Sequence, residues 1–389
     1  MATTTITSGV QYSGKWTLQS QAQAVAASTW PVPPLKASFW SWGYNVNGRL
    51  GDGTVVNKSS PVQIGALTDW GNNLGEGSAQ NSAVIKNTGN LWMWGDNGYT
   101  SLGLGNTTHY SSPKQVGSLT TWAKVVNSGP TIAIKTDGTL WAWGQNNYGQ
   151  LGLGDITNRS SPVQVGALTN WAFIDASEEH VVAVKTDGTL WSWGRNNNGQ
   201  LGLGNITNYS SPKQVGSLTG WLTAAAGSYR ASFAVRTTGE LYSWGKGEPF
   251  GQLGLSNITS YSSPKQVGTL TNWLSVSAGS GHVLSKKTNG TIWSWGRNSQ
   301  GQLGLENTTY YSSPKQIGAL VTWSSVVAGP LTSFARKTDG TIWSWGSGEF
   351  GSGGQDTISN YSSPKQIGAL TTWLGITAFY AGGSAVKSA

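Results

Sequence analysis

The chain has 389 residues, a formal net charge of +8 and no cysteine, which excludes disulfides, thiol nucleophiles and zinc–thiolate sites. Charged residues make up 10% of it, while Gly (55) and Trp (22) are abundant, a balance that argues against a disordered chain. No apolar run approaches the roughly 20 residues that a membrane-spanning helix needs.

Residues 1–36 differ in composition from the rest and are predicted to form an N-terminal arm or anchor. Alanine and glutamine over residues 17–28 favour a short helix, which Pro31, Pro33 and Pro34 would end. The segment lacks the basic and apolar regions of a secretory signal, so we expect no export by that route. It is too polar to form a core of its own, so we expect it to dock on another surface or to remain an arm.

Residues 37–389 repeat one pattern seven times. Its clearest marker is a Trp-Gly pair that recurs every 49 to 52 residues, at Trp42, Trp94, Trp143, Trp193, Trp244, Trp295 and Trp345. A Ser-Ser-Pro sequence and a further Trp recur in the same phase. A fixed period of this length indicates a repeat architecture.

Each copy is predicted to form four strands. In the copy over residues 221–268 the strands are LTAAAG, ASFAVRT, ELYSWG and a segment near SSPKQVG. A turn of the Thr-Asp-Gly type between the second and third strands is a strong hairpin signal. Four-stranded units repeated radially form a propeller. We therefore predict an all-β fold, a seven-bladed β-propeller with four strands per blade over residues 37–389.

The two ends of the repeat region complete each other. Residues 37–43 (ASFWSWG) form a third strand without its second, and residues 384–389 (SAVKSA) form a second strand without its third. We therefore predict that one blade is built from both ends, and that the C-terminal strand pairs with the first strand to latch the ring.

Basic residues recur at two positions of the repeat. One follows Ser-Ser-Pro, at Lys114, Lys213, Lys265, Lys315 and Lys365. The other precedes the hairpin turn, at Lys86, Lys135, Lys185, Arg236, Lys287 and Lys337. We interpret both sets as solvated strand-edge charges that discourage edge pairing. A nucleic-acid groove would gather such charge on one side, so we expect no nucleic-acid partner.

Two resemblances follow from these patterns. The phrase W-G-x-N-x-x-G-Q-L-G-L-G, at residues 143–154 and 193–204, resembles the repeat of the regulator of chromosome condensation family. That resemblance implies a seven-bladed propeller used as an interaction platform: the founding member acts on a small GTPase and chromatin, and a bacterial relative inhibits β-lactamases. The first copy departs at Arg49 and Asp52, and the last at residues 352–354. Residues 12–34 resemble the start of predicted bacteriophage structural or appendage proteins.

No pattern of catalytic residues is apparent. His109, His180 and His282 fall in different copies without a partner at metal-ligand spacing, and Glu178 and Glu179 are consecutive, so their side chains would point apart on a strand. The Asn-x-Thr sequences are interpreted as turns; they begin at Asn106, Asn205, Asn257 and Asn307. We expect no enzyme activity, no cofactor and no metal.

The copies differ from one another mainly in two windows, between the first and second strands and after the Trp-Gly pair. In an up-and-down blade both windows lie on one face, which is our candidate binding face. Its candidate residues are Tyr99, Tyr148, Glu178, Glu179, His180, Tyr229, Arg230, Glu248, Phe250, His282, Glu349, Phe350 and Tyr380. Aromatic and charged residues together are typical of recognition surfaces, whereas drift in exposed loops would also produce variation. The two histidines also fit a structural role, because the family repeat usually has a histidine there.

Two functions remain open on these observations. The first is a non-enzymatic, virion-associated structural or host-recognition (tail fibre or appendage) protein of a bacteriophage. Residues 1–36 would then bind other virion proteins, and the variable face a host surface protein or glycan. The second is a free, cytoplasmic interaction module that regulates or inhibits another protein through the same face. Assembly into a homo-oligomer is compatible with both.

Overall fold

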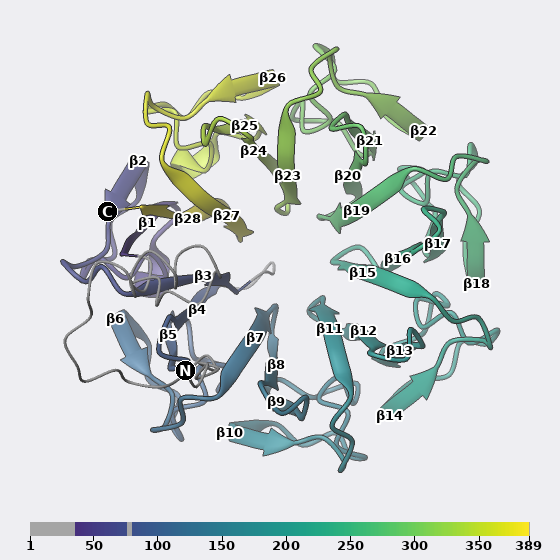
Figure 1. Ribbon diagram of the computed structural model, residues 1–389, viewed down its shortest axis with the longest axis horizontal. Helices are drawn as coiled ribbons and strands as arrows, with labels where there is room; N and C mark the ends of the chain where they lie inside the picture. The colour runs from purple at the N-terminus through teal and green to yellow at the C-terminus, as the bar shows by residue number, and fades with distance from the viewer. Residues whose placement is uncertain (1–35, 76–79, 389) are drawn as a thin grey trace, which may run out of the picture. The chain divides into compact units, whose positions relative to one another are not determined.

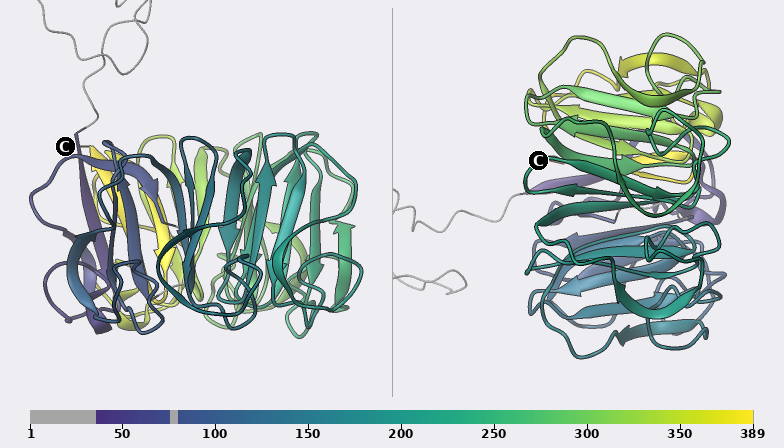
Figure 2. Two further views of the ribbon diagram at one scale, coloured as in Figure 1. Left: turned by 90° about the horizontal axis from the view of Figure 1, so that it is seen from below. Right: turned by 90° about the vertical axis from the view of Figure 1, so that its right-hand side faces the viewer.

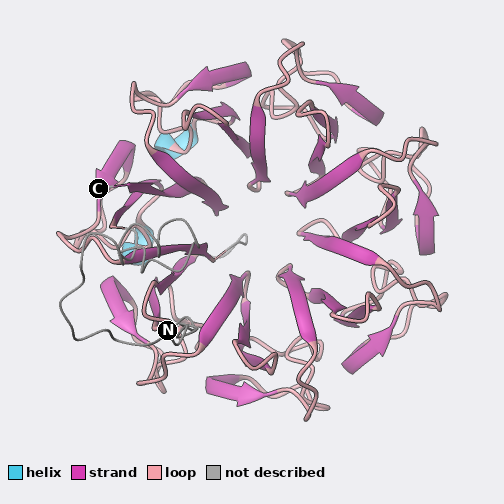
Figure 3. Ribbon diagram, in the orientation of Figure 1, coloured by secondary structure: helices cyan, strands magenta, loops and turns pink. Residues whose placement is uncertain are grey.

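The computed structural model describes residues 36–388 except residues 76–79, and all of them belong to one compact unit. The described residues form seven four-stranded antiparallel sheets arranged around a central axis (Figure 1). This confirms the predicted seven-bladed propeller. Strands dominate (Figure 3), and the helical segments are two short 3-10 turns, η1 (Val46–Gly48) and η2 (Glu349–Gly351). The predicted arm and its helix over residues 17–28 lie outside the described residues.

Each blade runs from an inner strand near the axis to an outer strand at the rim (Figure 1). The inner, first strands are β3 (Trp70–Leu74), β7 (Trp122–Asn127), β11 (Trp171–Ala176), β15 (Trp221–Gly227), β19 (Trp273–Ala278), β23 (Trp323–Ala328) and β27 (Trp373–Phe379). The second strands are β4 (Asn81–Lys86), β8 (Pro130–Lys135), β12 (His180–Lys185), β16 (Ala231–Arg236), β20 (His282–Lys287), β24 (Thr332–Lys337) and β28 (Gly382–Ser388).

The third strands, which carry the Trp-Gly pair, are β5 (Leu91–Gly95), β9 (Leu140–Gly144), β13 (Leu190–Gly194), β17 (Leu241–Gly245), β21 (Ile292–Gly296), β25 (Ile342–Gly346) and β1 (Ala37–Gly43). The outer, fourth strands are β6 (Tyr110–Gln115), β10 (Arg159–Gln164), β14 (Tyr209–Gln214), β18 (Tyr261–Gln266), β22 (Tyr311–Gln316), β26 (Tyr361–Gln366) and β2 (Lys58–Gln63). Blade 1 comprises β3 to β6, and blades 2 to 6 follow in chain order. Blade 7 combines β27 and β28 with β1 and β2.

Blade 7 contains the predicted latch. Strand β28 pairs with β1 along its whole length, from Ala37 opposite Ser388 to Gly43 opposite Gly382. Its other edge pairs with β27, so the last strand lies between the first strand of the chain and the strand before it. Val386 of β28 is fully buried. Closure of the ring by the two ends of the repeat region is confirmed.

The hydrophobic core lies between successive blades. One core cluster, for example, joins Ile132 and Leu140 of blade 2 to Trp171 and Trp193 of blade 3, and six equivalent clusters occupy the other interfaces. The second strands are mostly buried on both sides; β12, for example, is buried along its whole length, which explains the apolar run of residues 181–184. Every blade therefore buries its faces only against its neighbours, so the ring has to close to complete the core.

One hydrogen bond joins every pair of neighbouring blades. The indole Nε1 of the Trp in each Trp-Gly pair donates to a backbone carbonyl of the preceding blade; Trp193 to Gln150 O measures 2.9 Å. The remaining six Trp–acceptor pairs, at 2.8 to 3.2 Å, are Trp42–Ser352, Trp94–Arg49, Trp143–Ser101, Trp244–Gln200, Trp295–Gln252 and Trp345–Gln302. Because the acceptor is a main-chain oxygen, the copies that depart from Gln keep the bond.

A glycine beside this bond is required by space and by conformation. Gly152 has φ +74°, and a Cβ there would lie 2.9 Å from Trp193 Nε1. An alanine at this position would be strained by the left-handed backbone conformation, and its Cβ would clash with the indole. The glycine that follows Gln-Leu in the repeat is thereby explained.

The prediction that the lysines before the hairpin turn are solvated is wrong. Lys135, Lys185 and Lys287 are buried, because the sixth residue of the second strand faces the Trp residues of the first and third strands. Their Nζ atoms lie 3.5, 3.7 and 3.7 Å from an indole ring centroid, which is a cation–π geometry. Burial lowers the pKa of each of these lysines. The lysines after Ser-Ser-Pro sit on the outer strands, 5.3 to 5.8 Å from a tyrosine ring centroid.

Candidate binding surface

The two variable windows lie on one face of the propeller, as expected. In blade 3 the first residue of β12, His180, pairs with the last residue of β13, Gly194, which also pairs with Tyr209 at the start of β14. The connections between first and second strands and between third and fourth strands therefore meet at this face, which we call the loop face. The hairpin turns and the links between blades form the opposite face, the turn face, and the strands run between the two (Figure 2).

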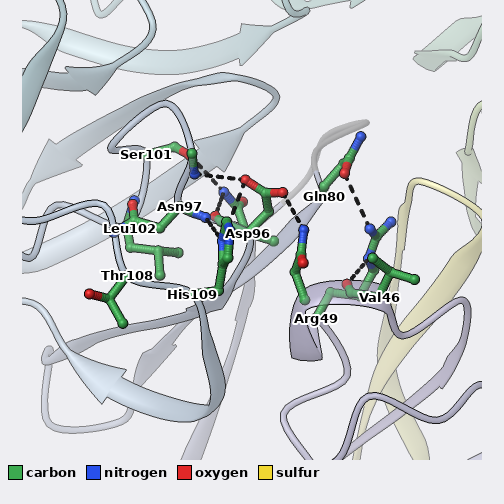
Figure 4. Close-up of polar contacts among 12 residues, drawn as sticks. Val46, Arg49, Gln80, Asp96, Asn97, Ser101, Leu102, Thr108 and His109 are labelled. Atoms are coloured by element: carbon green, nitrogen blue, oxygen red, sulfur yellow. Dashed lines mark hydrogen bonds and ion pairs between the residues drawn. The ribbon is translucent and has the colours of Figure 1, made fainter.

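A repeated asparagine fixes the outer loop of the loop face in five of the seven blades, at Asn45, Asn97, Asn146, Asn196 and Asn298. In blade 2, Asn146 Oδ1 accepts from Leu151 N at 2.9 Å, while its Nδ2 donates to Asp155 O at 3.0 Å. In blade 1, the Asn97 side chain makes the equivalent hydrogen bonds to Leu102 N and Asn106 O, and the Asn97 backbone N–H donates to His109 Nδ1 at 2.9 Å (Figure 4). The Asn-x-Thr sequences form Asx turns, as in Asn205 Oδ1 with Thr207 N at 3.0 Å. In those five blades these hydrogen bonds hold the backbone of the loop that carries the variable side chains.

One group of variable side chains links blades 2, 3 and 4. The guanidinium of Arg195 lies over the ring of Tyr148, 4.6 Å from its centroid, and its Nη1 donates to the Tyr148 hydroxyl at 3.2 Å. Arg195 also forms an ion pair with Glu179 Oε1. The other oxygen of Glu179 accepts from Arg230 Nε of the next blade at 2.9 Å. Glu179 thus orients two guanidinium groups on the loop face.

A second group continues this row across blades 4 and 5. Phe250 packs against Tyr229 with the two rings tilted by 52° and their centroids 5.1 Å apart, and it meets Tyr310 edge-on at 5.6 Å. Lys246 Nζ lies 4.6 Å from the ring centroid of Tyr229, and the guanidinium carbon of Arg297 lies 5.4 Å from the ring centroid of Phe250. Together with Tyr148, Glu179, Arg195 and Arg230 these residues form what we call the cation–aromatic sector.

A smaller aromatic group occupies blades 6 and 7. Tyr44 packs on Phe350 at 4.5 Å between centroids, and Arg49 lies over the rings of Tyr44 and Tyr380 at 4.7 and 5.7 Å. Arg49 is fully buried and also donates to Gln80 Oε1 (Figure 4) and to Tyr380 O. Burial lowers the pKa of Arg49 to about 10, so it stays charged at neutral pH. Beside this group, an open cleft of about 650 Å³ is lined by Glu349, Phe350 and their neighbours.

Two of the thirteen predicted residues cannot contact a ligand. His180 and His282 are fully buried and connect blades beneath the surface. The ring nitrogens of His180 lie 2.7 Å from Ser177 Oγ and 2.8 Å from Ser232 Oγ of the next blade, and His282 Nε2 lies 3.0 Å from Ser333 Oγ. Burial lowers the pKa of His180 to about 4 and that of His282 to about 3. Both are neutral structural residues at physiological pH.

The other predicted residues lie on the loop face but are not all brought together. Tyr148, Glu179, Tyr229, Arg230 and Phe250 contact one another or shared partners in the cation–aromatic sector. Phe350 and Tyr380 belong to the smaller aromatic group. The exposed residues Glu178, Glu248, Glu349 and Tyr99 lie in the surrounding loops.

Sequence reasoning missed the residue that directly follows each Trp-Gly pair. Arg195, Lys246 and Arg297 occupy this position in blades 3 to 5 and supply most of the cations of the sector, and Tyr44 occupies it in blade 7. The seven copies carry six different residue types here, with Arg occurring twice: Tyr44, Asp96, Gln145, Arg195, Lys246, Arg297 and Ser347. This variation among the copies was the sequence signal that could have identified the position as part of the binding surface. Within residues 36–75 and 80–388, no three His, Asp or Glu side chains converge as metal ligands, and no helix is long and apolar enough to cross a bilayer.

Solved structures show the same fold. Human WBSCR16 superposes with a TM-score of 0.80 at 17% identity, covering 91% of this chain and 99% of that one. Prp20p of Saccharomyces cerevisiae superposes with a TM-score of 0.78 at 21% identity, covering 92% of both chains.

Curated relatives match over short stretches. The human E3 ubiquitin-protein ligase HERC2 is 34% identical over 82 residues, which is 21% of this chain and 2% of HERC2. The Ultraviolet-B receptor UVR8 of Arabidopsis thaliana is 32% identical over 84 residues, or 22% of this chain and 19% of UVR8. This chain thus spans less than a fifth of either relative.

The family model for the regulator of chromosome condensation (RCC1) repeat matches residues 38–72, 88–131, 137–184, 187–235, 238–285 and 289–335. A second model of the same repeat matches residues 171–200 and 273–302. These matches cover well over half of the sequence and follow the period of the blades. The chain belongs to the regulator of chromosome condensation (RCC1) repeat family.

Proposed function

We propose that the chain is a non-enzymatic protein-interaction module that regulates or inhibits another protein through the cation–aromatic sector of its loop face. The observation that carries this proposal is the contact of three aromatic rings with cations: Tyr148 and Phe250 contact Arg195 and Arg297 of the next blade, and Tyr229 contacts Lys246 of its own blade. Tyr, Phe and Arg are enriched in the cores of protein interfaces and at their energetic hot spots. Side chains already held by stacking and ion pairs lose less entropy when a partner binds.

The family supports a protein partner. Prp20p, which shares this fold, is described as binding Gsp1p and histones, and a second related structure is that of Kap60 bound to yeast RCC1 (Prp20). In those cases the propeller protein binds other proteins. For this chain the same kind of use is our proposal, with the partner defined by chemistry: a surface that offers carboxylates to Arg230 and Arg297 and apolar groups to Phe250.

The virion hypothesis receives less support. It rests on the resemblance of residues 12–34, on the lack of a secretory signal and on the missing catalytic groups, and of residues 1–36 the structure describes only Lys36. None of the relatives or structures named above is a virion component by its name. We therefore favour the interaction module over placement in a virion and over binding of virion proteins or a host glycan.

The test compares three forms of the full chain as baits in quantitative pull-downs from the source cells. The first is the wild type, and the second carries Arg230→Asn, Phe250→Ala and Arg297→Ala on the loop face. Asn is chosen because Arg230 has φ +62°, a conformation that Asn tolerates. The control carries Leu218→Ala, Leu270→Ala and Leu320→Ala, which removes exposed apolar surface from the turn face.

We expect a protein that the wild type and the control retain equally and that the loop-face variant retains at least roughly tenfold less, since truncating even one hot-spot residue costs about 2 kcal/mol or more. The affinity of this protein for the purified forms should likewise be equal for the wild type and the control and lower for the loop-face variant. Retention that is unchanged in the loop-face variant, or lost equally in the control, would refute the assignment of this surface.

A further inference from the structure

A second surface lies on the turn face, on the side of the ring away from the cation–aromatic sector. All seven links between blades contain Gly-x-Leu, and each of these leucines is 42 to 50% exposed. They are Leu67, Leu119, Leu168, Leu218, Leu270, Leu320 and Leu370. Single exposed apolar residues are ordinary on a protein surface, whereas a set gathered on one face marks an interaction site.

The links project from the turn face on ordered turns. The glycine of each link has a φ of +57 to +63°, and a Cβ at any of the seven would meet no atom within 4 Å. Gln214 Nε2 donates to Gly216 O at 3.2 Å, and the equivalent bond closes five other links at 2.8 to 3.1 Å. The leucine two residues after the glycine is therefore carried by a backbone that hydrogen bonds hold in place.

Exposed lysines accompany the leucines in five links. Each lies five residues before its leucine, at the turn-face end of an outer strand, and four of them occupy the successive blades 3 to 6. They are Lys114, Lys213, Lys265, Lys315 and Lys365. None of the five forms an ion pair with another described residue. The seven links themselves contain one acidic residue, Asp69, which pairs with Lys86 at 3.0 Å.

The other acids of the turn face are matched within their own hairpins. Asp137 and Asp187 accept hydrogen bonds from the Thr two residues on, and each follows a buried lysine of the second strand by two residues. Asp339 has the same arrangement with Lys337, and Glu240 pairs with Arg236. Blade 5 has Asn289 in place of the turn Asp. The lysines of the outer strands are therefore left as the uncompensated charge of this face.

The exposed acids of the ring lie mainly on the other face. Exposed carboxylates in the connections of the loop face are Glu178, Glu248, Glu306, Glu349 and Asp356. The exposed charge of the ring is thus separated along its axis, with the unpaired lysines at the turn face (Figure 2). A positive face of this kind is attracted to a negatively charged surface and is oriented by it.

The uniformity of the turn face indicates the kind of partner. A specific protein partner is recognised through side chains that differ from place to place, as on the loop face, whereas the Gly-x-Leu links agree in all seven copies. A lipid bilayer offers every blade the same chemistry, with anionic head groups for the lysines and an apolar layer for the leucines. A nucleic acid would use the lysines and gain nothing from the leucines.

We propose that the turn face docks on the surface of an anionic lipid bilayer. The ring of leucines enters the boundary between head groups and acyl chains, and the lysines of blades 3 to 6 contact the head groups. Both apolar area and attraction to anionic lipids contribute to peripheral binding of this type. The loop face then points away from the bilayer, where its cation–aromatic sector stays accessible to a protein partner.

The test is cosedimentation of the full chain with vesicles of phosphatidylcholine that contain about 30% phosphatidylserine, and with vesicles of phosphatidylcholine alone, at about 0.1 M salt. The lysine variant is K265V/K315V, which introduces the residue of two other copies, Val62 and Val163. The matched control is K58Y/R159Y, at the loop-face ends of outer strands where the other five copies have Tyr. Both variants lose two positive charges, so an effect of net charge alone would appear equally in both.

We expect the wild type to bind the anionic vesicles at least about tenfold more tightly than the neutral ones. K265V/K315V should weaken binding to the anionic vesicles at least about tenfold, because two lysines near the head groups are lost. The control K58Y/R159Y should stay within about twofold of the wild type, since its charges lie more than a Debye length from the bilayer. Equal binding to the two kinds of vesicle, or equal losses in the two variants, would overturn the proposal.

A third variant tests the leucines. L218A/L270A/L320A keeps every lysine and should weaken binding to the anionic vesicles at least about tenfold, because apolar insertion is lost. If only the lysine variant weakened binding, the turn face would be a site for polyanions in general, such as nucleic acid, and the bilayer assignment would be wrong. The melting temperature of each variant shows whether its ring is intact. The same leucine substitutions should leave retention of the protein partner unchanged, so this proposal and the proposed function can fail separately.

Discussion

The two buried histidines should make the ring sensitive to mild acid. The pKa of His180 is lowered from 6.5 to about 4 and that of His282 from 6.5 to about 3, in both cases by burial. Between these values and 6.5 the unfolded chain binds a proton at each site and the folded ring does not. Their contribution to stability is therefore fully present above about pH 6.5 and is lost as the pH falls toward the folded pKa values.

The size of the effect follows from the same values. Near pH 5 each histidine binds nearly one more proton in the unfolded chain, so the pair should lower the free energy of unfolding by about 2 to 3 kcal/mol per pH unit. By pH 4 the total loss should approach about 6 kcal/mol for the two sites. Carboxylates of the hairpin turns such as Asp137 and Asp187, whose pKa values are lowered mainly by hydrogen bonds from the Thr two residues on, contribute below this window. The histidines therefore dominate between about pH 6.5 and 5.

The assay is urea unfolding followed by tryptophan fluorescence at about pH 7, 6 and 5. Wild type is compared with a double variant that carries His180→Ala and His282→Thr, the residues that blades 4 and 6 have at the same position (Ala231 and Thr332). The variant should be less stable at pH 7, because interblade hydrogen bonds are lost, but its stability should change much less between pH 7 and 5. A double variant with the same slope as the wild type would refute the assignment of the slope to these two sites.

Three further predictions concern the scaffold. Deleting residues 384–389 removes the part of β28 that contains Val386 and leaves β1 and β27 without their partner strand. By calorimetry we expect a single cooperative transition and a free energy of unfolding lower by at least about 3 kcal/mol. An unchanged melting temperature would contradict the latch. In urea unfolding, Trp193→Phe should cost about 1–3 kcal/mol more than Trp244→Phe. Among the described residues Gln150 O accepts a hydrogen bond only from Trp193, whereas Gln200 O would still accept one from the Ser232 hydroxyl at 2.8 Å after Trp244 is replaced. Equal costs would show that leaving the Gln150 carbonyl without a donor does not affect stability. Lys286→Val should raise stability by about 1 kcal/mol, since it removes a half-buried charge that has no partner among the described residues. A lower melting temperature would show that the lysine contributes to the fold.

The fold was predictable from the sequence because its determinants recur within each repeat. The Trp-Gly pair, the hairpin turn and the incomplete strands at the two ends together specify seven blades and the latch. The error over Lys135 and its equivalents arose because a lysine was judged by its charge alone. The position faces Trp residues of the first and third strands, and their regular occurrence in the same repeat was the signal for a cation–π contact.

The binding surface was less predictable because its contacts join different repeats. Tyr148 meets Arg195 from the next blade, and Glu179 meets Arg230, 51 residues away. Comparing the copies identified which windows vary, but it could not show which variable side chains meet.

The interblade hydrogen bond explains how such variation is tolerated. Each indole donates to a main-chain oxygen, so the side chain of the acceptor residue does not affect the bond. Four blades have Gln at the acceptor position, while Ser101, Ser352 and Arg49 occupy it elsewhere, with the same bond at 2.9 to 3.2 Å. Arg49 can therefore direct its guanidinium to Tyr44 and Tyr380 on the loop face while its backbone holds the ring together. A scaffold fixed through its main chain leaves side chains at the same positions free to build a binding surface.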